Sequence, residues 1–117
     1  MTLLHDPSLS TWLDICASDV ITPDRGVAAR VSGAQVALFV LSTGEVYAIE
    51  NLDPFSGANV LCNGIVGDRG GVPTVASPVY KQRFALSTGE CLDDPEVSVR
   101  CWDARIQNGR VIVRVPR

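Results

Sequence analysis

The sequence predicts an all-β protein, an antiparallel β-sandwich built from short strands. Turn residues recur at short intervals, and the stretches between them alternate apolar and polar residues, as half-buried strands do. Asn108-Gly109 stands between two such stretches, and Asn-Gly is a strong signal for a tight hairpin turn. No window supports a helix of three turns, and residues 18–21 allow one turn at most.

Size and composition fit one domain, residues 1–117. A chain of this length buries roughly two-thirds of the surface that its unfolded form exposes, so a core can form without metal or disulfide staples. Apolar residues make up 46% of the chain and charged residues 20%. This composition is ordinary for a globular domain and excludes a disordered tail, a collagen-like rod or a coiled coil.

The outer parts of the chain contain the expected strands: residues 11–17, 27–32, 35–41, 45–50, 97–106 and 110–115. The last of these shows the alternation most clearly. Val111, Val113 and Val115 share one face, and Arg110 and Arg114 share the other. Such a strand buries its valine face and exposes its arginine face.

The middle of the chain has a different pattern. Residues 51–71 and the approach to residues 77–82 are expected to be mostly loop, and the glycines of Gly67–Gly71 are expected to form a flexible turn. Two long loops in a tight all-β domain are a usual location for function. The chain is therefore expected to have two parts: base strands in about residues 11–50 and 90–117, and a loop subdomain in about residues 51–89.

Charge argues against nucleic acid and membranes as partners. The formal net charge is −3, and the ten basic residues are scattered rather than gathered in a stripe. The longest apolar run, Val36–Leu41, is far shorter than the about 20 residues of a membrane-spanning helix. Residues 1–7 lack the charged and apolar regions of a signal peptide, so we expect a cytoplasmic protein.

The four cysteines, Cys16, Cys62, Cys91 and Cys101, include no C-x-x-C pair. Zinc sites usually draw ligands in such pairs, and disulfides are rare in a reducing compartment. We therefore expect these cysteines to be small buried hydrophobic residues. Cys101 is expected to be buried because it continues the alternating row of Val97 and Val99.

Two segments, Asn51–Ala58 and Ser77–Gln82, resemble the cluster loops of a Rieske [2Fe–2S] domain. Rieske loops carry C-x-H and C-x-x-H, and their two cysteines and two histidines hold the two irons. The former ligand positions in this chain are Asp53, Phe55, Ser77 and Tyr80. None of them is a cysteine or histidine, and the only histidine is His5. The resemblance therefore implies a Rieske-like fold with two inserted loops and without a metal cluster.

The ordered set of motifs is similar to the small subunit of assimilatory NAD(P)H-dependent nitrite reductase. This family has Asp-Pro-Phe-Ser in the first loop, Ser-Pro-x-Tyr-Lys-Gln in the second, and then Phe-x-Leu-x-Thr-Gly-x-Cys-Leu-Asp-Asp-Pro. The chain matches these motifs at residues 53–56, 77–82 and 84–95. Ile65–Asp68 also matches, and the resemblance covers about Trp12 to Val115.

The resemblance implies an accessory chain with no catalytic residue and no redox cofactor of its own. In this family the large subunit holds FAD, siroheme and an iron–sulfur cluster, and it reduces nitrite to ammonium. The small subunit is expected to bind the large subunit through the two loops. The candidate partner-binding residues are Asp53, Pro54, Phe55, Ser56, Pro78, Tyr80, Lys81 and Gln82.

There are two alternative functions. A Rieske-type ferredoxin of another electron-transfer or oxygenase system needs the four cluster ligands, and their absence decides against it. A binding module would hold a small molecule between the loops. The loop aromatics also allow two interpretations. Phe55 and Tyr80 either anchor the partner or pack on each other in the space of the lost cluster. In the second case, Asp53 or Ser77 would hydrogen-bond the Tyr80 hydroxyl.

Overall fold

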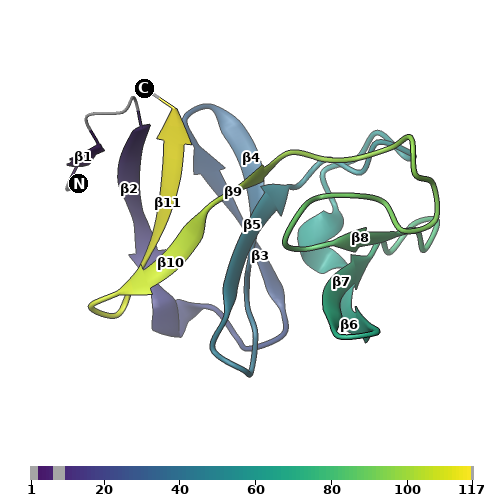
Figure 1. The fold of residues 1–117 in the computed structure, drawn as a ribbon, viewed down its shortest axis with the longest axis horizontal. Coiled ribbons are helices and arrows are strands. Elements are labelled where there is room, and N and C mark those ends of the chain that lie inside the picture. Colours follow the sequence, from purple (N-terminus) through teal and green to yellow (C-terminus); the bar gives the residue numbers. More distant parts are fainter. Residues whose placement is uncertain (1–2, 7–9, 117) are drawn as a thin grey trace.

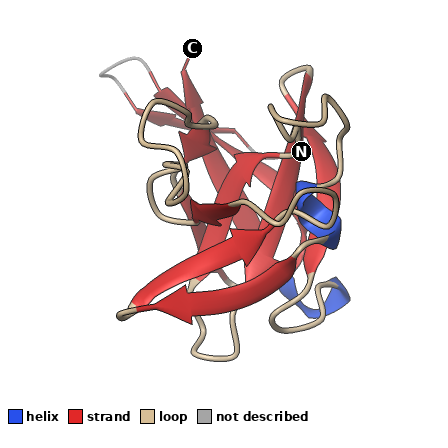
Figure 2. Ribbon diagram, turned by 90° about the vertical axis from the view of Figure 1, so that its right-hand side faces the viewer, coloured by secondary structure: helices blue, strands red, loops and turns tan. Residues whose placement is uncertain are grey.

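The computed structural model describes residues 3–6 and 10–116, and strands form nearly all of the regular structure in them (Figures 1 and 2). The strands are β1 (Leu3–Asp6), β2 (Ser10–Ala17), β3 (Gly26–Val31), β4 (Ala34–Val40), β5 (Val46–Glu50), β6 (Ile65–Arg69), β7 (Val72–Ala76), β8 (Arg83–Ala85), β9 (Cys101–Trp102), β10 (Ala104–Gln107) and β11 (Arg110–Pro116). Two 3₁₀ turns, η1 (Ser18–Val20) and η2 (Leu61–Asn63), complete the described elements. The all-β prediction is confirmed.

The strands form three antiparallel sheets, which lie side by side from left to right in Figure 1. Their strand orders are β1-β2-β11-β10, β3-β4-β5-β9 and β6-β7-β8. The predicted Asn-Gly turn joins β10 to β11: Gln107 pairs with Arg110, and both Asn108 and Gly109 have positive φ. No helix within the described residues has the length and hydropathy that a membrane span requires.

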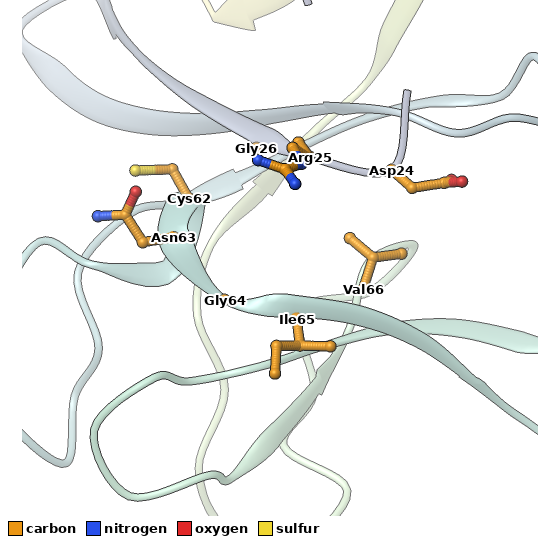
Figure 3. Close-up of a pocket in the computed structure, with 8 residues that line it drawn as sticks. All are labelled: Asp24, Arg25, Gly26, Cys62, Asn63, Gly64, Ile65 and Val66. Atoms are coloured by element: carbon orange, nitrogen blue, oxygen red, sulfur yellow. The ribbon is translucent and has the colours of Figure 1, made fainter. Parts of the chain in front are cut away.

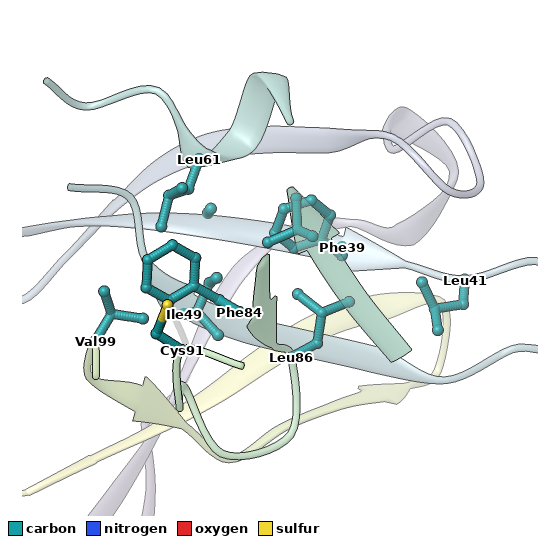
Figure 4. Close-up of a cluster of buried hydrophobic side chains, with 10 residues drawn as sticks. Phe39, Leu41, Ile49, Leu61, Phe84, Leu86, Cys91 and Val99 are labelled. Atoms are coloured by element: carbon teal, nitrogen blue, oxygen red, sulfur yellow. The ribbon is translucent and has the colours of Figure 1, made fainter. Parts of the chain in front are cut away.

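Strand β4 contributes side chains to both hydrophobic cores. Val36 and Leu38 point toward the first sheet and pack with Val111 and Val113. Ala37 and Phe39 belong to the other cluster, which lies against the third sheet (Figure 4). The members of that cluster are Ala37, Phe39, Leu41, Ile49, Leu61, Val75, Phe84, Leu86, Cys91 and Val99. Burial on both faces explains why the β4 sequence is an unbroken apolar run rather than an alternating one.

The expectation that residues 51–71 are mostly loop is wrong for their second half. Residues 65–69 form β6, which pairs with β7 through a two-residue turn at Gly70 and Gly71. Both glycines have positive φ, as such a turn requires. The Gly67–Gly71 segment is thus a strand end and a hairpin turn. The strands were difficult to predict because they are short and contain Gly67 and Pro73.

The expected strand at residues 97–106 is also shorter than predicted. Regular pairing begins at Cys101, and Asp103 separates β9 from β10. Because residues 97–100 do not continue the strand, the alternating row does not extend to Cys101. That cysteine is exposed, with its thiol within 3.5 Å of the Thr88 carbonyl, whereas Val99 is buried. The predicted burial of Cys101 is therefore wrong.

Candidate functional site

The first loop is tied to the second sheet by Asn51, which directly follows β5 and is almost fully buried. Its side-chain amide donates to Gln35 Oε1 at 3.1 Å and to the Asn59 carbonyl at 3.2 Å. Its Oδ1 accepts the Cys62 N–H at 2.8 Å. One side chain thus fixes the two ends of the loop and attaches them to β4.

Asp53 organises the tip of the first loop. Its Oδ1 accepts the Phe55 N–H at 2.9 Å, and its Oδ2 accepts the Ser56 hydroxyl at 3.0 Å. The main chain closes the same turn, because the Asp53 N–H donates to the Ala58 carbonyl at 2.8 Å. Pro54 lies between Asp53 and Phe55, which are joined by the hydrogen bond to Oδ1, and it is exposed.

The second loop closes on itself in a similar way. The Ser77 N–H donates to the Gln82 carbonyl at 2.9 Å, and the Lys81 N–H donates to the Ser77 carbonyl at 3.1 Å. Ser77 Oγ accepts the Val79 N–H at 3.2 Å. Lys81 has a positive φ, and its ammonium group donates to the Pro78 carbonyl at 3.2 Å. The loop is therefore a compact turn that presents residues 79–81 to solvent.

A hydrogen bond between side chains joins the two loops. The Ser77 hydroxyl donates to Asp53 Oδ2 at 2.6 Å, and both residues are buried, with exposed fractions of 1% and 0%. Burial raises the pKa of Asp53, but the hydrogen bonds from Ser77, Phe55 and Ser56 lower it by more. The pKa of Asp53 is thus below its ordinary value, and the carboxylate is ionised at neutral pH.

The two loop aromatics have different surroundings. The Phe55 ring packs on Phe84 with centroids 6.3 Å apart, and Phe84 belongs to the buried cluster of Figure 4. Tyr80 is 60% exposed. The interpretation in which Phe55 and Tyr80 pack on each other is therefore wrong. The expected contact of the Tyr80 hydroxyl with Asp53 or Ser77 is replaced by the bond between Asp53 and Ser77 themselves.

The partner-binding candidates differ in exposure. Pro54, Tyr80 and Lys81 are exposed, Phe55, Ser56, Pro78 and Gln82 are half-buried, and Asp53 is buried. Val79, which sequence reasoning missed, is 45% exposed beside Tyr80. We call Pro54, Val79, Tyr80 and Lys81 the loop tip. It combines apolar and aromatic side chains with one cation.

A cleft of about 450 Å³ lies elsewhere, between the start of β3 and the junction of η2 with β6. Its lining residues are Asp24, Arg25, Gly26, Cys62, Asn63, Gly64, Ile65 and Val66. Figure 3 shows Val66 pointing toward the segment that carries Arg25, while Ile65 points the other way. The lining includes one thiol and no histidine, so it contains no Cys–His pair for nucleophilic catalysis. No sequence motif marked this cleft.

The loops do not fit a [2Fe–2S] cluster. A Rieske cluster needs two thiolates and two imidazoles, whereas the former ligand positions present a carboxylate, a phenyl ring, a hydroxyl and a phenol. The Asp53 oxygens already accept hydrogen bonds from the chain, and the Phe55 side chain has no atom that can coordinate iron. His5 lies in β1, at the opposite end of the molecule from β8 (Figure 1). Across the described ranges, no three His, Cys, Asp or Glu residues form a group that could hold a metal ion.

An ion pair beside the second loop makes the stability of the fold depend on pH in the acid range. Arg83, the first residue of β8, donates to Asp93 Oδ1 at 2.8 Å, and its N–H donates to Oδ2. The Arg83 side chain, followed by its backbone N–H, lowers the pKa of Asp93 from 3.8 to about 2. The carboxylate therefore stabilises the fold above pH 4, and this contribution is lost as pH falls from about 4 to about 2.

We expect the Asp93→Asn variant to lose less stability than the wild type as pH falls over this range. Urea unfolding at pH 5, 3.5 and 2.5 measures the difference, which should be small because the pair is partly exposed. The matched control is Asp19→Asn, at an exposed position in η1. The expectation would be contradicted if the free energy of unfolding fell equally with pH in the wild type and in the Asp93 variant.

Fold and site together define a Rieske-like domain whose loops lack the iron ligands, and the family model of the Rieske-like [2Fe-2S] domain matches residues 11–114. The NADH nitrite reductase small subunit of Salmonella typhimurium is 45% identical over 107 residues, which cover 91% of this chain and 99% of that protein. This chain therefore belongs to the family of NADH nitrite reductase small subunits.

Two further relatives bear on fold and function. A crystal structure described as the NADH-dependent nitrite reductase small subunit of Mycobacterium tuberculosis is 50% identical, with a TM-score of 0.89. It covers 93% of this chain, and the match spans 98% of that structure. The nitrite reductase [NAD(P)H] large subunit of Klebsiella oxytoca is 44% identical over 110 residues. That match covers 92% of this chain but 11% of the large subunit.

Proposed function

We propose that this chain is the accessory small subunit of an NAD(P)H-dependent assimilatory nitrite reductase in the cytoplasm. It binds a large subunit that holds siroheme, FAD and an iron–sulfur cluster and reduces nitrite to ammonium. The chain itself carries no redox cofactor. The observation that carries the proposal is the match to small subunits over 99% of their length. The chemistry of the loops supports it, because their residues do not fit an iron–sulfur cluster.

The Klebsiella oxytoca protein supports association of the two subunits. A segment similar to nearly all of this chain makes up 11% of that large subunit. In that organism the small-subunit sequence is thus joined covalently to a large-subunit chain. A separate small subunit would keep the same neighbour through a non-covalent interface.

The loop tip is the surface that we assign to this interface. Tyr80 and Val79 are 60% and 45% exposed, and Pro54 of the first loop is also exposed. Exposed tyrosines are favoured contact residues at protein interfaces because they bury a large area at a small cost in side-chain entropy. Lys81 adds a cation that would pair with an acidic residue of the partner. Asp53 is buried, so its side chain does not itself touch the partner.

We expect Tyr80→Ser to weaken binding to the cognate large subunit about tenfold or more, because a tyrosine that becomes buried on binding is a typical interface hot spot. Titration of the purified subunits measures the dissociation constant. NADH-dependent nitrite reduction by the mixture provides the functional readout. The control is Val20→Ser, since Val20 has a similar exposure of 65% and lies in η1.

If the wild-type chain does not bind the large subunit, the proposed function is wrong. If it binds and Tyr80→Ser binds equally well, the loop tip is not the interface. The ferredoxin alternative receives no support from the former ligand positions. A binding module for a small molecule between the loops receives no support either, because the Asp53 and Ser77 side chains, which join the two loops, are already hydrogen-bonded to each other.

A further inference from the structure

In a Rieske domain, bonds to the metal cluster hold the two loops together. These loops have lost the ligands but still lie against each other. The direct contact is the Ser77 hydroxyl on Asp53 Oδ2 at 2.6 Å, shorter than most neutral hydrogen bonds and typical of one with a charged acceptor. Both side chains are buried, so water does not compete for this bond.

We propose that Asp53 and Ser77 are positioning residues, and that their hydrogen bond replaces the metal cluster as the link that holds the loop tip in its partner-binding arrangement. The proposal rests on the proposed function for the identity of the partner. It deepens that function because it assigns separate roles to the loop residues. Pro54, Val79, Tyr80 and Lys81 contact the large subunit, and Asp53 and Ser77 act through them.

The hydrogen bonds run from this link to both parts of the loop tip. On one side, Asp53 Oδ1 holds the Phe55 N–H and thereby fixes Pro54 between them. On the other side, Ser77 Oγ accepts the Val79 N–H, which precedes Tyr80. One connected set of bonds therefore spans both exposed segments. If the Ser77 hydroxyl moved away, the buried Asp53 carboxylate would lose a hydrogen bond that offsets its desolvation. Opening the bond between the loops therefore costs free energy.

The hydrogen bonds around Asp53 offer a matched pair of variants. Ser56 and Ser77 both donate a hydroxyl hydrogen bond to Asp53 Oδ2, at 3.0 Å and 2.6 Å. Ser56 belongs to the same loop as Asp53, whereas Ser77 belongs to the other loop. Ser56→Ala and Ser77→Ala thus remove chemically similar bonds, but only the second variant removes a hydrogen bond between the two loops.

The first test uses the isolated full-length chain and NMR. We expect Ser77→Ala to lower the backbone amide order parameters of residues 55–56 and 79–81 and to weaken the NOE contacts between the loops. Ser56→Ala is expected to keep the contacts between the loops. If Ser77→Ala keeps the wild-type order and contacts, or if both variants lose them equally, the proposal is overturned.

The second test measures affinity for the large subunit in a double-mutant cycle of Asp53→Asn and Ser77→Ala. Each single variant is expected to bind about tenfold more weakly, and the double variant no more weakly than the weaker single variant. Additive losses of about a hundredfold would show independent roles and overturn the proposal. Wild-type affinity for Ser77→Ala would do the same.

The two proposals fail in distinguishable ways. If the wild-type chain does not bind the large subunit, the proposed function fails, and the NMR comparison still decides whether the bond orders the loops. If the wild-type chain binds and Ser77→Ala binds equally well, the positioning role fails and the proposed function stands. Thermal unfolding of each variant reports the fraction folded, so a loss of affinity is not confused with a loss of fold.

Discussion

Replacing Asn51 by alanine is expected to lower the free energy of unfolding by about 3 kcal/mol or more. The side chain is 1% exposed and makes three hydrogen bonds. Its loss leaves the Cys62 N–H, the Gln35 side-chain oxygen and the Asn59 carbonyl without their donor or acceptor. Each of these groups then loses a partner in or near a buried region, at about 1–3 kcal/mol where water cannot replace it. Urea unfolding measures the change.

Two variants separate the hydrogen bonds from other effects. Asn59→Ala is the matched control, because Asn59 is exposed and contributes its backbone carbonyl to the network. We expect it to change stability by no more than about 0.5 kcal/mol. Asn51→Asp keeps the volume and the acceptor for the Cys62 N–H, but it places a buried carboxylate oxygen against the Gln35 side-chain oxygen and the Asn59 carbonyl. At neutral pH it should therefore be at least as destabilising as alanine. Equal stability of Asn51→Ala and Asn59→Ala would contradict the expectation.

The parts of the fold that the sequence predicts well are hairpins with strong local signals. Alternation marks β11, and Asn108-Gly109 fixes its register with β10. The unbroken apolar run of β4 predicts a strand, although not that its two faces serve two different cores. Such patterns succeed because neighbours in the sequence decide them.

Sequence patterns failed where contacts between distant residues decide the structure. The β6–β7 hairpin is short and glycine-rich, and it gains stability by placing Val75 in the cluster with Phe84 and Phe39. The candidate site shows the same division. The motif identified both loops, but the burial of Asp53 and the packing of Phe55 on Phe84 depend on residues about 20 to 30 positions away.

Gly89→Ala is the other substitution with a large expected effect. Gly89 has φ of +80°, and an added Cβ would lie 2.1 Å from the Val99 carbonyl oxygen. The Gly89 carbonyl also accepts the Val99 N–H at 2.8 Å, so the two segments cannot separate without losing that bond. An L-residue in the left-handed region costs about 1–2 kcal/mol, and the forced displacement adds about 1–3 kcal/mol. We expect a loss of about 3 kcal/mol or more.

Gly44→Ala isolates the two contributions to this loss. Gly44 has φ of +96°, and an added Cβ would meet nothing within 4 Å. This variant should therefore show the backbone cost alone, about 1–2 kcal/mol. The difference between the two variants in urea unfolding then measures the close approach of Gly89 to Val99. Similar losses for both would mean that the turn after β8 can move away from Val99. In that case the segment before β9 would not be held as tightly as its hydrogen bonds indicate, because the 2.1 Å contact would have been relieved at little cost.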